Sequence, residues 1–247
     1  MAVALEQFKV TEDVDTALAA VFDASGTATA GNLLITTAAA RWGASGPVGT
    51  FTQPDGYALA FQIAPMEAHT AALAWKEAAG GETTATWTAS GTFDGTITSI
   101  YEYSGITDPI LDKTADDGSN ATSVTSIATG STGTLGAAAG MVFLIGLDRG
   151  GAGDNKLSNT EPSLTALDET QDSGVSGGAT GFNHCNAWKE FGATTALNVT
   201  VASVNNSRMG AGIATFIAGG GAADPEGSLI RGKLLNGGLL LGGVLIR

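Results

Sequence analysis

The chain has 247 residues, and 24 Asp and Glu against 11 Lys and Arg give it a formal net charge of −13. This acidity argues against nucleic-acid binding, because a nucleic-acid-binding face must neutralise phosphates with Lys and Arg. Only 14% of the residues are charged and 36 are Gly, a composition typical of a β-rich protein with a sizeable core rather than of a helical enzyme.

Short β-like runs alternate with Gly-, Ser- and Asp-rich turns over residues 2–218. Residues 97–103 and 197–201 alternate with the two-residue period of a strand that buries one face. We therefore predict an all-β fold, an antiparallel β-sandwich of jelly-roll type. The expected strands are 8–10, 32–39, 57–63, 70–76, 84–89, 96–103, 123–127, 141–147, 164–168, 186–191, 196–203 and 210–218.

An internal echo favours two similar halves. Residues 74–77 and 187–190 both read Ala-Trp-Lys-Glu, and each is followed by a Thr-rich segment and a long apolar strand. Two interlocked Greek keys would produce such paired hairpins. Chance similarity in a chain rich in Thr and Ala is the alternative.

Residues 31–112 carry several structural motifs. These are Gly-Asn-Leu-Leu-Ile at 31–35 leading to Arg41, Pro-Asp-Gly-Tyr at 54–57, Ala-Trp-Lys at 74–76, Glu-Thr-Thr at 82–84 with Thr-Trp-Thr at 86–88, and Tyr-Glu-Tyr-Ser-Gly-Ile at 101–106 followed by Pro109 and Asp112. This third of the chain resembles a domain of structural proteins of tailed-bacteriophage and prophage virions. The resemblance implies a β-sandwich in a virion component and supplies no catalytic residues; the extra residue in Pro-Ile-Leu-Asp departs from its pattern.

Four large aromatic residues, Trp75, Trp87, Tyr101 and Trp188, are expected in the core or at its rim. The alternative is a platform on which sugars stack. The two histidines, His69 and His184, and the single Cys185 do not form a catalytic pattern. His184 and Cys185 are adjacent, so on a strand they point to opposite faces. No spaced zinc ligands and no phosphate-binding loop occur, so we expect no catalytic site and no cofactor.

Acidic residues gather in two turn-like segments. Asp112, Asp116 and Asp117 are calcium candidates because calcium takes oxygen ligands from such loops. Their spacing is not that of an EF-hand, so solvated turn residues are the preferred interpretation, and no metal is expected. The second group contains Asp148, Asp154 and Asn155.

Residues 219–226 have the composition of a linker, which divides a sandwich body at 1–218 from a tail at 227–247. The tail repeats every five residues, beginning at Gly227. This matches neither a helix nor a strand period. Each unit places two apolar residues after its Gly, and these predict an oligomerisation surface: Leu229, Ile230, Leu234, Leu235, Leu239, Leu240, Val244 and Leu245. A membrane span is disfavoured by Arg231 and Lys233.

Together these features predict a non-enzymatic structural protein of a bacteriophage virion: a capsid decoration protein, a head fibre or a tail appendage. Its expected partners are copies of itself, most simply a trimer wound through the tail, and other capsid or tail proteins; nucleic acid and membrane are not expected. The alternative is a carbohydrate-binding module for host recognition, with surface glycans as partners. A glycan-degrading enzyme is a third hypothesis.

Overall fold

A computed structural model describes residues 2–13, 18–23, 26–42, 49–63, 69–91, 93–118, 123–148, 157–161, 168–175 and 182–219. In these residues strands are the only regular elements, and all of their pairings are antiparallel. The predicted all-β, antiparallel class is therefore confirmed.

The strands fall into two halves along the chain. The N-terminal half contains β1 (Ala4–Asp13), β2 (Ala19–Val21), β3 (Leu33–Trp42), β4 (Phe51–Thr52), β5 (Ala58–Gln62), β6 (His69–Glu77), β7 (Thr84–Thr86), β8 (Thr88–Ala89) and β9 (Phe93–Ser104). The C-terminal half contains β10 (Pro109–Gly118), β11 (Val124–Ala128), β12 (Gly140–Asp148), β13 (Leu157–Thr160), β14 (Asp168–Val175), β15 (Phe182–Phe191), β16 (Thr200–Ser207) and β17 (Met209–Ala218).

Each half builds one large sheet with the same strand order. The N-terminal large sheet runs β1-β9-β3-β6-β5 and the C-terminal large sheet runs β10-β17-β12-β15-β14. The small sheets correspond as well: β2-β7 and β4-β8 in the first half match β11-β16-β13 in the second, if β7 and β8 count as one interrupted strand. The two halves therefore repeat one eight-stranded arrangement.

The register of the large sheets repeats too. Trp75 pairs with Ile35, and Trp188 pairs with Phe143 in the same places of the two sheets. We call such positions equivalent. The edge strands β1 and β10 carry bulges at equivalent positions, between Leu5 and Gln7 and between Leu111 and Lys113. Because a bulge is a specific local irregularity, its repetition supports the similarity of the halves that the Ala-Trp-Lys-Glu echo predicted.

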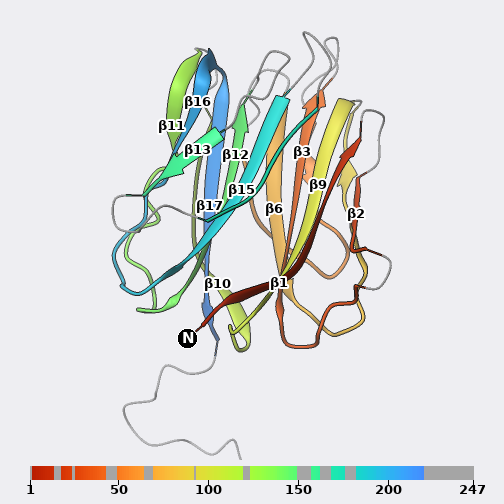
Figure 1. Cartoon of the computed structure of the whole chain (residues 1–247), viewed down its shortest axis with the longest axis vertical. Helices are drawn as coiled ribbons and strands as arrows, with labels where there is room; N and C mark the ends of the chain where they lie inside the picture. Colours follow the sequence, from red (N-terminus) through yellow and green to blue (C-terminus); the bar gives the residue numbers. More distant parts are fainter. Residues whose placement is uncertain are drawn as a thin grey trace, which may run out of the picture.

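The body has more layers than the single sandwich that the sequence predicts. The large sheets face each other across a central core that contains Tyr101, Tyr103, Phe143 and Phe216. A second core lies between the C-terminal large sheet and β11-β16-β13, and a third lies between the N-terminal large sheet and its small sheets. Both large sheets are thus covered on two faces, which explains why β6, β12 and β17 are almost continuously buried. Figure 1 shows the two halves side by side, red to yellow and green to blue.

Most expected strands are present. The sequence also predicts that seven large apolar residues of these strands are buried. Six of them are buried, namely Trp87, Ile100, Phe143, Leu147, Val199 and Ile213, whereas Trp75 is half-buried. The sequence analysis missed β2, β4, β10 and β13. Of the expected strand at 164–168, only Asp168 lies within the described residues. β10 was taken for a turn because it contains three Asp, which are uncommon in strands. As an edge strand it pairs only with β17, which leaves Asp116 and Asp117 exposed to water.

Candidate functional site

Both ends of the described body lie at the same end of the large sheets. Ala4 pairs with Ser104, and Pro109 pairs with Ala218; we call this the proximal end and the opposite one the distal end. Val3 donates its backbone N–H to Glu190 Oε1 at 2.5 Å. Figure 1 shows the N-terminus and the proximal end of β17 at the bottom of the molecule. Whatever follows residue 219 therefore begins beside the N-terminus.

The connection between the halves is fitted tightly into this proximal end. Gly105 has φ +90°, and a Cβ there would lie 2.0 Å from the Ala2 carbonyl oxygen. Only glycine has both the conformation and the space for this approach. Gly219 donates its N–H to the carbonyl oxygens of Thr107 and Asp108, at 3.1 and 2.7 Å. These contacts hold the last described residue against the connection.

Aromatic rings join the halves through two matching contacts. Trp75 packs edge-on against Phe216 with ring centroids 5.6 Å apart, and Trp188 packs against Tyr103 at 5.3 Å. The two Trp positions are equivalent, and so are Phe216 and Tyr103. This reciprocity gives the body an approximate two-fold axis along the strands. Trp87 and Tyr101 are enclosed by the protein and offer no open ring face for sugar stacking.

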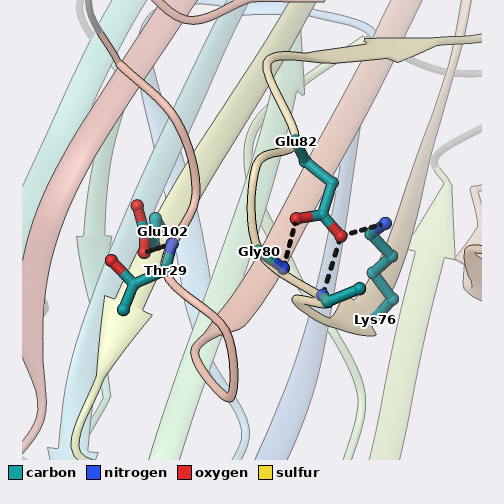
Figure 2. A network of polar contacts seen from close by, with 6 residues as sticks. Thr29, Lys76, Gly80, Glu82 and Glu102 are labelled. Atoms are coloured by element: carbon teal, nitrogen blue, oxygen red, sulfur yellow. Dashed lines mark hydrogen bonds and ion pairs between the residues drawn. The ribbon is translucent and has the colours of Figure 1, made fainter.

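A polar network closes the turn after β6 (Figure 2). Glu82 accepts hydrogen bonds from the N–H groups of Ala79 and Gly80 at 2.8 and 2.9 Å, and it pairs with Lys76 Nζ at 2.7 Å. Burial raises the pKa of Glu82, but the hydrogen bonds and the Lys76 charge outweigh burial and lower this pKa to about 2. Lys76 also lies over the Tyr57 ring. The network is a structural clamp, because backbone N–H groups of the turn and Lys76 already occupy the oxygens of the Glu82 carboxylate.

Glu102 forms a second clamp, partly visible in Figure 2. This buried carboxylate accepts hydrogen bonds from Gln7 Nε2 at 2.5 Å, Asn32 Nδ2 at 2.6 Å and the Thr29 N–H at 2.7 Å. At the equivalent position Thr215 accepts the Lys113 N–H at 3.0 Å. Both side chains thus hold the residue that follows the edge-strand bulge.

The calcium candidates do not share a loop. Asp112, Asp116 and Asp117 lie along β10, where neighbouring side chains point to opposite faces. Asp112 Oδ2 accepts the Gly136 N–H at 2.9 Å. Partial burial of its carboxyl group, and then the Asp117 charge, raises the pKa of Asp116. Across the described ranges no three His, Cys, Asp or Glu side chains gather as a metal ion would require.

The histidines and the cysteine are buried in different places. His69 and Phe182, at equivalent positions, pack edge to face at 5.8 Å in the central core. His184 faces the same core, and its burial lowers the pKa of the imidazole to about 3. Cys185 points into the second core instead, as predicted for adjacent strand residues. The structure thus turns the thiol and the neighbouring imidazole to opposite faces of the sheet.

Asp148 is a fully buried carboxylate at the distal end of β12. Asn183 Nδ2 donates to its Oδ1 at 2.9 Å and Ser203 Oγ donates to its Oδ2 at 2.6 Å. Its predicted neighbours Asp154 and Asn155 lie outside the described residues. These hydrogen bonds join the distal ends of β12 and β15 to the middle of β16.

The sequence analysis placed Arg41 at the end of a structural motif and not in a candidate site, although its environment is chemically unusual. Arg41 lies near the distal end of β3 and is only 8% exposed, although the described residues supply no ion-pair partner for it. An Arg directly after an apolar run of Ala was the available signal, but burial depends on the facing sheet and cannot be read from spacing.

The predicted oligomerisation residues, from Leu229 to Leu245, lie outside the described residues. Comparisons with family models, curated proteins and solved structures found no significant match to this chain. The described residues contain no helix whose length and hydropathy would let it span a membrane.

Proposed function

We propose that this protein is a non-enzymatic structural component of a bacteriophage virion, displayed as a decoration protein, head fibre or tail appendage. The observation that carries the proposal is the position of both ends of the body at its proximal end. Residues 227–247 then act as the attachment element at that end, and the distal end points away from the attachment surface.

In this proposal each half is a jelly-roll-like sandwich. With the strands of a half numbered one to eight, its large sheet has the order 1-8-3-6-5 and its small sheet the order 2-7-4. A jelly roll made of two Greek keys has this alternation of early and late strands in each sheet. Strand 5 lies beside strand 6 in the large sheet. The body is then a tandem of two such units packed through their large sheets.

The edge strands favour assembly through the tail over assembly through the body. An exposed edge can pair with another chain, and charged side chains oppose this. β1 carries Glu6 and Lys9, and β10 carries Asp112, Lys113, Asp116 and Asp117. By contrast, the tail has eight apolar residues in two phases of its repeat. Each stabilises an assembly by about 1.5–3 kcal/mol when fully buried, so three tails wound together is the simplest arrangement.

Sedimentation velocity tests the tail's role in the full chain. The unaltered protein should sediment as an oligomer, most simply a trimer, whereas the double variant Leu234→Asp/Leu239→Asp should sediment as a monomer. The control is the single change Val21→Asp, which places one Asp at a body residue that is already 43% exposed and should leave the oligomer intact.

The virion assignment is tested separately. Antibodies against the body should label particles released by the cells that encode the protein, and quantitative mass spectrometry of purified particles should find it at tens to hundreds of copies if it is a decoration protein. Particles that lack the protein would contradict the proposal even if the tail oligomerises.

A further inference from the structure

Arg41 is buried at the distal end of the central core. Along β3, Leu33, Ile35 and Ala39 face this core, and the two-residue alternation places Arg41 on the same face. The Nε and Nη1 atoms of Arg41 are both buried and have no hydrogen-bond acceptor among the described residues. The side chain is therefore a nearly enclosed guanidinium for which the described residues supply no counter-charge.

The two residues that pair in register with Arg41 are a histidine and a glycine, and neither is acidic. Arg41 pairs in register with His69 on β6 and with Gly95 on β9. His69 packs against Phe182 of the other half. His184 faces this core too, while the buried carboxylate of Asp148 lies on the other face of its sheet, bonded to Asn183 and Ser203. The Asp148 carboxylate therefore does not neutralise Arg41.

A second arginine of the described body lies at the same end. Arg41 lies at the distal end of β3, and Arg208 directly precedes β17, whose first residue Met209 pairs with Asp148 at the distal end of β12. In a chain of net charge −13, two arginines at one end of the body are a specific feature.

A buried charge without a partner is strongly unfavourable unless it is neutralised and hydrogen-bonded. The guanidinium cannot lose its proton and presents planar donors that match oxyanions. We propose that the distal end of the central core binds a small oxyanion, the carboxylate or phosphate group of a ligand, through Arg41. Such a group is either a free ion or a substituent of an acidic oligosaccharide. This inference concerns the body alone and does not depend on the virion role.

Titration of the full-length protein with inorganic phosphate tests the site at constant ionic strength, with sodium chloride replaced stepwise. Phosphate should raise the melting temperature along a saturable curve, by about 5 °C at a hundredfold excess over Kd. A general salt effect would instead grow without saturating. Isothermal calorimetry should give the same Kd.

Arg41→Met is the decisive variant, because it keeps the length of the side chain and removes the charge. It should lose the saturable response and melt no lower than the unaltered protein when phosphate is absent. Lys9→Met, which removes an exposed cation on β1 that pairs with Asp23 at 2.9 Å, is the matched control and should keep the response. Arg41→Lys should bind more weakly and serves if Arg41→Met fails to fold.

A second arm distinguishes the sources of the anion. Oligogalacturonate presents carboxylates on a sugar chain, and neutral dextran is its control. If oligogalacturonate competes with phosphate and the competition depends on Arg41, the ligand is a carboxylate on an oligosaccharide. If only phosphate binds, the ligand is a free ion. The proposal is overturned if neither ligand gives a saturable response with the unaltered protein, or if Arg41→Met responds equally.

Discussion

The two halves of the body share a backbone plan and differ in the side chains that they turn toward each other. Six residues before the equivalent Trp, the N-terminal half has His69 and the C-terminal half has Phe182. Two residues before the same Trp, the N-terminal half has Leu73 and the C-terminal half has Asn186. The Asn186 amide donates a hydrogen bond to the Tyr101 hydroxyl of the N-terminal half at 2.7 Å. Register, bulges and ring contacts are thus repeated, whereas polar groups differ. The shape of the central core is set by the repeated features, and its chemistry by the unequal ones.

The outer cores show the same contrast. In the N-terminal half the small-sheet strand is interrupted between β7 and β8 at Trp87, which is buried and donates its Nε1–H to Thr36 Oγ1 at 3.0 Å. In the C-terminal half the corresponding strand β16 is continuous. A large side chain in one core therefore coincides with a break that the other core does not have.

The largest expected effect tests the reciprocal ring contacts. Phe216→Ala and Tyr103→Ala should each lower the free energy of unfolding by about 3–5 kcal/mol, because both remove a fully buried ring and leave a cavity. Urea unfolding measures both. Ile110→Ala, at a residue 44% exposed, is the control and should cost below about 1 kcal/mol. A small cost at only one of the two ring positions would show that the halves are not energetically equivalent.

The bulge clamps sharpen the comparison. Glu102→Gln should lower the free energy of unfolding by about 2–4 kcal/mol, because it removes the charge that accepts three hydrogen bonds. The amide NH2 group of the new side chain would also face N–H donors, with which it cannot form a hydrogen bond. Thr215→Val, at the equivalent position, should cost about 1 kcal/mol, since it removes only neutral hydrogen bonds with the Lys113 backbone. Equal costs in urea unfolding would contradict the assignment of Glu102 as the stronger clamp.

His184 should make stability depend on pH, whereas Ala71, its equivalent, cannot. Burial lowers the pKa of His184 to about 3, below its value of about 6.5 in the unfolded chain. The unfolded state therefore binds the proton first, so this stabilisation is present above pH 6.5 and is lost as the pH falls toward 3. When the pH falls from 7 to 5, the free energy of unfolding should decrease by about 2 kcal/mol less in His184→Leu than in the unaltered protein. Urea unfolding at the two pH values measures the difference, and parallel losses would be evidence against a neutral native His184.

The smallest expected effect makes the halves more alike. The Tyr103 hydroxyl is buried without a hydrogen-bond partner among the described residues, and the equivalent residue is Phe216. Tyr103→Phe should change the free energy of unfolding by less than about 1 kcal/mol, toward greater stability, because an unsatisfied buried hydroxyl is removed. Thermal unfolding should detect the shift; a clear loss of stability would reveal a partner for the hydroxyl.

The sequence predicted those parts of the fold that depend on local pattern. The alternation at 97–103 and the apolar run at 141–147 identified β9 and β12, and the Ala-Trp-Lys-Glu echo identified the equivalent strands β6 and β15. β10 was missed because an edge strand tolerates Asp residues that the local pattern assigns to a turn. The environment of Arg41 was beyond such reasoning, because it arises where two sheets from distant parts of the chain meet.

The short connection between β9 and β10 has a consequence for how the halves stay together. Only residues 105–108 separate the two strands, so each half meets the other within the same chain. Pairing is then governed by an effective concentration, which reaches the millimolar range for short linkers. Dilution, which dissociates a dimer of separate subunits, leaves this pairing unchanged. The body should therefore keep its central core at any protein concentration at which the chain is folded.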